Sequence, residues 1–110
     1  MSNQPISVAK ANSMIQQNLA YMSSLGVNMS KQTESVSFDG TILQQWLATV
    51  MPFADELRIC LGVYPPGDPS AGRITTILWP YKNGQPATQP PAGDGATVMI
   101  EPFNEGQHNP

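Results

Sequence analysis

The segment that decides the fold is Leu57-Arg58-Ile59-Cys60-Leu61-Gly62-Val63-Tyr64, in which apolar residues recur at every second position. Alternation of this kind puts one face of an extended chain on a core, so the segment is predicted to be a β-strand. Residues 65–72 are rich in Pro and Gly and are predicted to form a loop. Residues 73–79 carry several β-branched side chains and are predicted to form a second strand, paired with the first as an antiparallel hairpin.

Three further segments follow the hairpin. Pro80 ends the second strand, and residues 82–95 are rich in Pro, Gly, Gln and Thr, which predicts a long loop. Residues 96–101 read as a third strand that Pro102 closes, and the polar tail at residues 103–110 is predicted to be irregular and flexible.

Two amphipathic helices are predicted before the hairpin. The first spans residues 6–24, with Ser7 as N-cap, Gly26 as the stop, and an apolar stripe of Val8, Ala11, Ile15, Leu19 and Met22. The second begins at an N-cap, either Asp39 or Thr41, and ends near Met51 because Pro52 follows. Its apolar stripe consists of Ile42, Leu43, Trp46, Leu47 and Val50. The connection between the helices is polar and can become extended around residues 34–38.

These elements predict a single α+β domain over residues 1–110, with residues 1–5 and 103–110 flexible. Two N-terminal helices are expected to pack on one face of a small antiparallel sheet of three to four strands. That face is expected to meet Val8, Ile15, Trp46 and Leu47, which leaves the other face open to solvent or to a partner.

Composition excludes several classes of function. Five basic residues, scattered along a chain of net charge −3, are too few for phosphate-driven binding of nucleic acid or for a polybasic membrane patch. No run approaches the roughly 20 apolar residues of a membrane span. No signal peptide is recognised, so a cytoplasmic location is expected, although a secreted form whose signal has been removed remains open.

No cofactor or metal is expected. Cys60 and His108 are the single cysteine and histidine, which excludes a disulfide within the chain and a Cys/His zinc site. Cys60 is interpreted as packing in an apolar run. Phosphate-binding and nucleophile-elbow motifs are absent from the sequence.

The order of motifs resembles a family of small uncharacterised proteins found mainly in Bacteroidota. The segments that carry the resemblance are Ile6-Ser7-Val8-Ala9-Lys10-Ala11, Val36-Ser37-Phe38, Leu57 through Tyr64, Gly72-Arg73-Ile74-Thr75 through Trp79-Pro80, and Asn104-Glu105-Gly106. The resemblance covers most of the chain and implies a fold. It implies no mechanism, because the family has no assigned reaction.

Three sets of residues are candidates for function. Arg58 and Arg73 could lie on one sheet face and bind a carboxylate or phosphate ligand, or they could pair with Glu56, Glu101 or Asp55 across the strands. Aromatic and apolar side chains near the strand ends suit a protein interface, or alternatively the rim of the core: Tyr64, Thr75, Ile77, Trp79 and Tyr81. An acid–base set of Asp39, Glu101 and His108 is the third, and Asp39 is better explained as a helix cap.

The sequence therefore favours a small binding or assembly protein that acts through an uncovered sheet face or edge. Its expected partner is a second copy of itself or another protein. A small enzyme or anion-binding protein that uses Arg58 and Arg73 is the first alternative, and an immunity or phage-encoded inhibitor protein is the second. Catalysis is left open and is not favoured.

Overall fold

The computed structural model describes residues 3–90, 97–104 and 106–109 of the chain. The elements in these residues are α1 (Val8–Ser24), β1 (Ser35–Ser37), α2 (Gly40–Val50), a 3-10 helix (Met51–Phe53), β2 (Glu56–Val63), β3 (Ile74–Lys82), β4 (Gln85–Pro86), β5 (Thr88–Gln89), β6 (Val98–Met99) and β7 (Gln107–Asn109). Antiparallel pairing gives a sheet of order β2-β3-β4, a β1–β7 pair and a β5–β6 pair. The chain is an α+β protein, as predicted.

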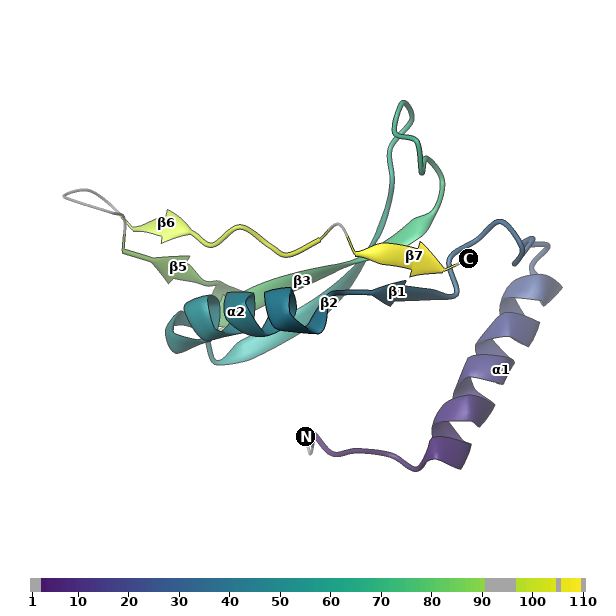
Figure 1. Cartoon of the computed structure of the whole chain (residues 1–110), viewed down its shortest axis with the longest axis horizontal. Helices are drawn as coiled ribbons and strands as arrows, with labels where there is room; N and C mark the ends of the chain where they lie inside the picture. Colours follow the sequence, from purple (N-terminus) through teal and green to yellow (C-terminus); the bar gives the residue numbers. More distant parts are fainter. Residues whose placement is uncertain (1–2, 91–96, 105, 110) are drawn as a thin grey trace.

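The β2–β3 hairpin confirms the central prediction, and its turn projects from the rest of the molecule (Figure 1). The ladder runs from Glu56 opposite Tyr81 to Val63 opposite Ile74. A bulge ends it, because the Tyr64 N–H donates to the Arg73 carbonyl at 3.1 Å while the Gly72 N–H donates to the Tyr64 carbonyl at 3.0 Å. Gly72 has a φ of +83°, which L side chains rarely adopt, so a glycine is favoured at this corner.

The third strand of this sheet is β4, which lies in the segment predicted to be a loop. Asn83 and Gly84 have φ values of 52° and 76°, and two positive values in succession are typical of the type I′ turn that closes a tight hairpin. The strand predicted over residues 96–101 is present as β6 (Val98–Met99), but it is not the third strand of the hairpin's sheet, because it pairs with β5 instead. The Asn-Gly turn places β4 directly beside β3. This short-range pairing occupies the edge of β3 that the predicted third strand would have used. Residues 91–95 of the predicted loop and Ala96 lie outside the described residues.

The tail also departs from the prediction, because residues 107–109 form β7 and pair with β1, with Val36 opposite His108. Gly106 precedes β7 and allows this approach. A Cβ atom at Gly106 would lie 2.6 Å from the Val36 side chain and 2.7 Å from that of Phe38. Residues 1–2, 105 and 110 of the predicted flexible ends lie outside the described residues.

The core lies between α2 and the segments that follow the hairpin. Asp39 confirms its predicted role as N-cap, because its Oδ1 accepts a hydrogen bond from the Ile42 N–H at 3.0 Å. The buried residues Val50, Ala87 and Ile100 form one cluster, against which Trp46, Met51 and Ala54 pack. Phe103 extends this packing, with its ring centroid 4.8 Å from that of Trp46 and 5.3 Å from that of Phe38.

Helix α1 forms as predicted, but most of it stands away from the sheet (Figure 1). Ser7 caps it by accepting from the Lys10 N–H at 3.1 Å. No residue of α1 is buried, and Val8 and Ile15 are 78% and 54% exposed, so the expected packing of these two side chains on the sheet is not found. The helices are also not consecutive, because β1 lies between them. An apolar stripe shows that a helix has a surface to bury, but it does not specify where.

Candidate functional site

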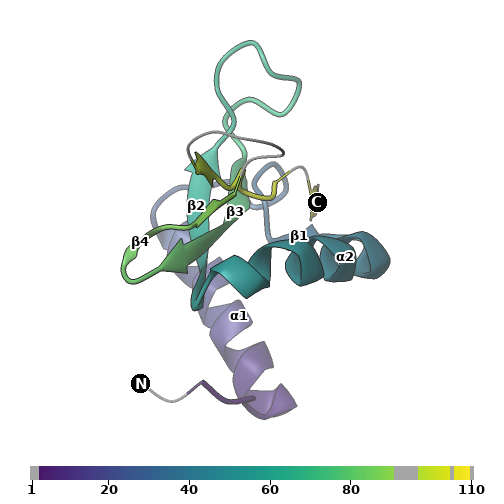
Figure 2. The same cartoon turned by 90° about the vertical axis from the view of Figure 1, so that its left-hand side faces the viewer.

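The two faces of the β2–β3 hairpin differ in what covers them. Partners in an antiparallel ladder point to the same side, so the face that carries Leu57, Ile59, Leu61 and Val63 also carries Ile74, Thr76, Leu78 and Pro80. Helix α2 lies beside the hairpin (Figure 2), and its Leu43 and Leu47 line an apolar groove together with Leu57, Ile59 and Leu78. We call the face of the hairpin that carries these side chains and borders this groove the inner face.

The inner face is buried at Leu78 and Pro80 of β3 and open along most of β2. Leu78 is 6% exposed and Pro80 is fully buried, whereas Ile59, Leu61 and Val63 are 66%, 77% and 63% exposed. We call these three side chains the β2 apolar row. They occupy every second position of one strand and therefore lie on the same face, so together they form an apolar patch, in contrast to a single exposed apolar residue.

The outer edge of β2 is unpaired within the described ranges. In the sheet order β2-β3-β4, β2 is terminal, whereas β3 is bounded by β2 on one side and by β4 and Phe103 on the other. The Leu78 N–H donates to the Phe103 carbonyl at 2.8 Å, and the Phe103 N–H donates back at 2.9 Å. Among the described strands of this sheet, only β2 therefore has a long outer edge of unpaired peptide groups.

The phase of the ladder determines which peptide groups point outward. The Tyr64 N–H bonds to Arg73, so the even-numbered residues of β2 bond to β3. The N–H and C=O groups of Leu57, Ile59, Leu61 and Val63 then point away from β3. The β2 apolar row and the unpaired peptide groups thus belong to the same residues.

This edge lacks the features that keep exposed strands from pairing with other chains. Residues 56–63 contain no Pro, no Lys and no bulge. The strand has two charged residues, and they neutralise each other, because Arg58 Nε lies 3.1 Å from Glu56 Oε1. The arrangement can therefore accept an additional strand.

Two grooves border the β2 apolar row. One has a volume of about 350 Å³ and is lined by Ile59 and by side chains of α2 and residues 36–38. The other has a volume of about 270 Å³, and in it Leu61 faces Met22 and Met29 from α1 and the connection that follows. Because both grooves open beside the row, a partner on β2 could also fill them.

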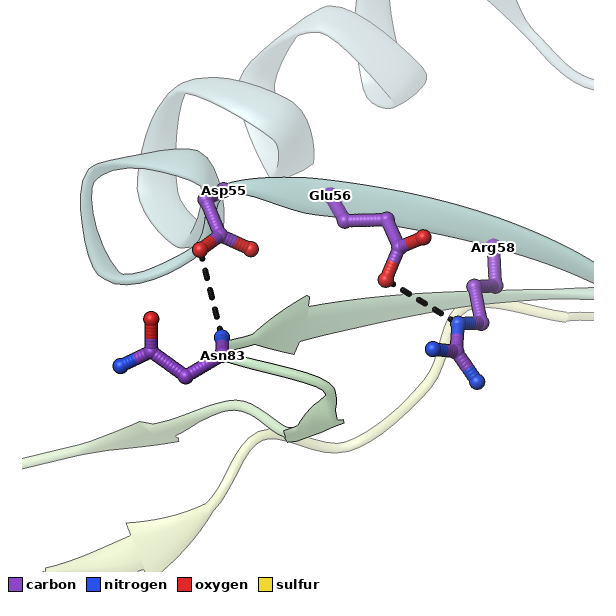
Figure 3. Close-up of polar contacts among 4 residues, drawn as sticks. All are labelled: Asp55, Glu56, Arg58 and Asn83. Atoms are coloured by element: carbon purple, nitrogen blue, oxygen red, sulfur yellow. Dashed lines mark hydrogen bonds and ion pairs between the residues drawn. The ribbon is translucent and has the colours of Figure 1, made fainter. Parts of the chain in front are cut away.

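The structure does not bring the two arginines together. Arg58 contacts Glu56 (Figure 3), and its guanidinium lies 3.9 Å from the centroid of the Tyr81 ring. Arg58 is opposite Trp79, and Arg73 lies six residues before Trp79 along the chain, which places their Cα atoms about 20 Å apart. Both residues lie on the same side of the hairpin, but the Arg58 guanidinium is held by Glu56 and Tyr81.

The predicted interface residues lie on the side opposite the β2 apolar row. Thr75 is 4% exposed, and its hydroxyl donates to the Tyr64 hydroxyl at 3.3 Å. Ile77, Trp79 and Tyr81 are half-buried, and the rings of Trp79 and Tyr81 meet edge to face with centroids 6.3 Å apart. The sequence does not predict which face of the hairpin is covered, and the structure shows that the β2 apolar row is the more exposed surface. Alternation shows that Ile59, Leu61 and Val63 share a face, but it does not show whether that face is covered.

The carboxylate of Asp55 holds the turn between β3 and β4. Asp55 Oδ2 accepts a hydrogen bond from the Asn83 N–H at 3.2 Å, which ties the start of β2 to the turn between β3 and β4 (Figure 3). Asp55 and Asp39 thus have structural partners, and Glu101 is exposed. Among the described residues no three His, Cys, Asp or Glu side chains gather as a metal site would require.

Comparisons with known proteins add no further assignment. The chain matches no family model, no curated protein and no solved structure. The resemblance to small proteins of Bacteroidota therefore stays a prediction. Neither α1 nor α2 has the length and apolar character needed to cross a membrane.

Proposed function

We propose that this chain is an assembly protein that binds other protein chains through the outer edge of β2 and the β2 apolar row. One observation carries the proposal: Ile59, Leu61 and Val63 are 63–77% exposed on the same strand whose outer edge is unpaired. Partner binding to an edge strand combines main-chain hydrogen bonds with burial of alternate side chains, and β2 offers both groups at the same residues.

The exposed area of the chain supports assembly. A monomeric folded protein of 11.9 kDa exposes about 6,000 Å², whereas this chain exposes 7996 Å². Its radius of gyration is 16.9 Å, compared with about 13 Å for a compact domain of this length. The excess of about 2,000 Å² is comparable to the area that one partner loses in an obligate assembly.

The energies are consistent with association. Burial of three aliphatic side chains that are about two-thirds exposed contributes roughly 3–6 kcal/mol. That contribution is similar to the lower part of the entropic cost of association, roughly 4–15 kcal/mol. Hydrogen bonds along the edge of β2 would then supply the remaining free energy of association.

The charge of the chain is compatible with a second copy as the partner. The chain has a net charge of −3, and charged residues make up 12% of it, about half the usual share. Two copies therefore repel each other weakly, and few charges have to be desolvated when their surfaces meet.

Light scattering on size-fractionated protein tests the proposal. We expect a mass of at least twice 11.9 kDa at micromolar concentration. Ile59→Lys adds a charge to the β2 apolar row and should return the mass to that of one chain. Ile42→Lys is the matched control, because Ile42 is 56% exposed on α2 and lies outside the row. A wild-type mass of 11.9 kDa at all concentrations would contradict self-assembly.

A further inference from the structure

We infer that the partner of β2 is the β2 strand of a second copy, joined edge to edge and antiparallel about a two-fold axis that passes beside Cys60. This inference rests on the proposed assembly function. The two sheets of order β2-β3-β4 would then become one continuous sheet. A two-fold axis uses the same surface on both copies, so the edge must be complementary to itself.

The phase of the ladder restricts the register. Hydrogen-bonded pairs between the two strands must form between residues whose peptide groups point outward, which are the odd-numbered residues of β2. With Cys60 at the axis, Leu57 pairs with Val63 of the second copy and Ile59 pairs with Leu61 of the second copy. Every outward-facing residue of β2 then has a partner.

The neighbouring symmetric registers are poorer. An axis at Ile59 would place Asp55 opposite Val63, but the Asp55 N–H already donates to the Tyr81 carbonyl at 2.9 Å. An axis at Leu61 would place Pro65 opposite Leu57, and proline has no N–H to donate. In each of these two registers, an outward-facing residue at one end of β2 therefore lies opposite a residue that cannot donate a hydrogen bond to it.

Side chains on both faces fit the register with Cys60 at the axis. On the inner face Ile59, Leu61 and Val63 would pack beside Leu61, Ile59 and Leu57 of the second copy, so that the two rows bury part of each other. On the other face Arg58 lies opposite Gly62, and Glu56 lies opposite Tyr64 of the second copy. No two like charges face each other across the junction.

The register gives Cys60 a use as a probe. Cys60 would face its own copy in a pair without hydrogen bonds, where Cα atoms lie about 4.5 Å apart. That separation is within the range that a disulfide bridges, about 4.4–6.8 Å. Diamide, which takes up the two electrons and two protons released by the two thiols, should therefore link the chains.

The experiment combines diamide treatment with a measurement of mass by light scattering before oxidation. We expect a covalent dimer of wild-type protein in non-reducing electrophoresis, none with Cys60→Ser, and at least a tenfold slower reaction with Ile59→Lys. A double variant, Cys60→Ser with Ile42→Cys, places an exposed thiol on α2 and should react at the slow rate of random collision. Equal rates for this variant and the wild type would overturn the inference.

The outcomes separate the two proposals. A non-covalent dimer that diamide does not link at Cys60 would overturn the edge-to-edge register while the assembly function stands. A wild-type protein that is monomeric at all concentrations would overturn both.

Discussion

The guanidinium of Arg58 lies over the ring of Tyr81, with the guanidinium carbon 3.9 Å from the ring centroid. The same side chain pairs with Glu56 at 3.1 Å, so its position is explained by contacts within the sheet. An arginine held by both a carboxylate and an aromatic face does not require an anionic ligand.

We therefore expect small anions to leave the thermal stability of the protein unchanged. A thermal-shift screen with phosphate and small carboxylates should give no rise in Tm, because a ligand stabilises the native state only if it binds there. Arg58→Lys should change the free energy of unfolding by less than about 1 kcal/mol, since the Arg58 side chain is 45% exposed and lysine keeps the positive charge. A rise in Tm that Arg58→Lys or Arg73→Lys abolishes would instead favour the anion-binding alternative.

The cap of α2 gives a second prediction. Asp39→Ala removes the acceptor of the Ile42 N–H and should lower the free energy of unfolding by about 1 kcal/mol in urea denaturation. Asp39→Asn retains a side-chain oxygen and should lose much less. Equal stability of Asp39→Ala and wild type would show that the cap contributes nothing, whereas loss of assembly without loss of stability would give Asp39 a role beyond capping.

The junction between β1 and β7 gives a third prediction. Gly106→Ala would place a methyl group 2.6 Å from Val36 and 2.8 Å from the Ser37 carbonyl oxygen, so the strands must separate. The expected cost is about 1–3 kcal/mol, as for overpacking elsewhere. Gly40→Ala is the control, because nothing lies within 4 Å of a Cβ atom there, and its effect should stay within about 0.5 kcal/mol. Similar unfolding free energies for the two variants would contradict the close approach at Gly106.

Local signals in the sequence predicted the elements whose causes are themselves local. Asp39 and Ser7 occupy cap positions that side-chain chemistry defines, and the alternation from Leu57 to Tyr64 defines a strand. The Asn83-Gly84 turn also had a signal, since this pair is typical of tight hairpins. The prolines on either side of it favour a loop and outweigh this signal.

Long-range arrangements could not be predicted in the same way. Nothing local to residues 107–109 indicates pairing with β1, which depends on the small size of Gly106. The stripe of α1 and the alternation of β2 each predict an apolar surface, and both surfaces remain exposed in one chain. Which surface covers which is a property of tertiary and quaternary packing, and the period of a single segment does not contain it.

Amide hydrogen exchange of β2, measured residue by residue, tests the central claim most directly. The N–H groups of Arg58, Cys60 and Gly62 bond to β3 and should exchange slowly in both the assembled and the monomeric folded protein. Those of Leu57, Ile59, Leu61 and Val63 point outward, so they should exchange slowly in concentrated wild-type protein and quickly in monomeric Ile59→Lys. If these four outward amides exchange at the rate of an unstructured peptide in a solution where light scattering gives twice the chain mass, the edge of β2 is not the assembly surface.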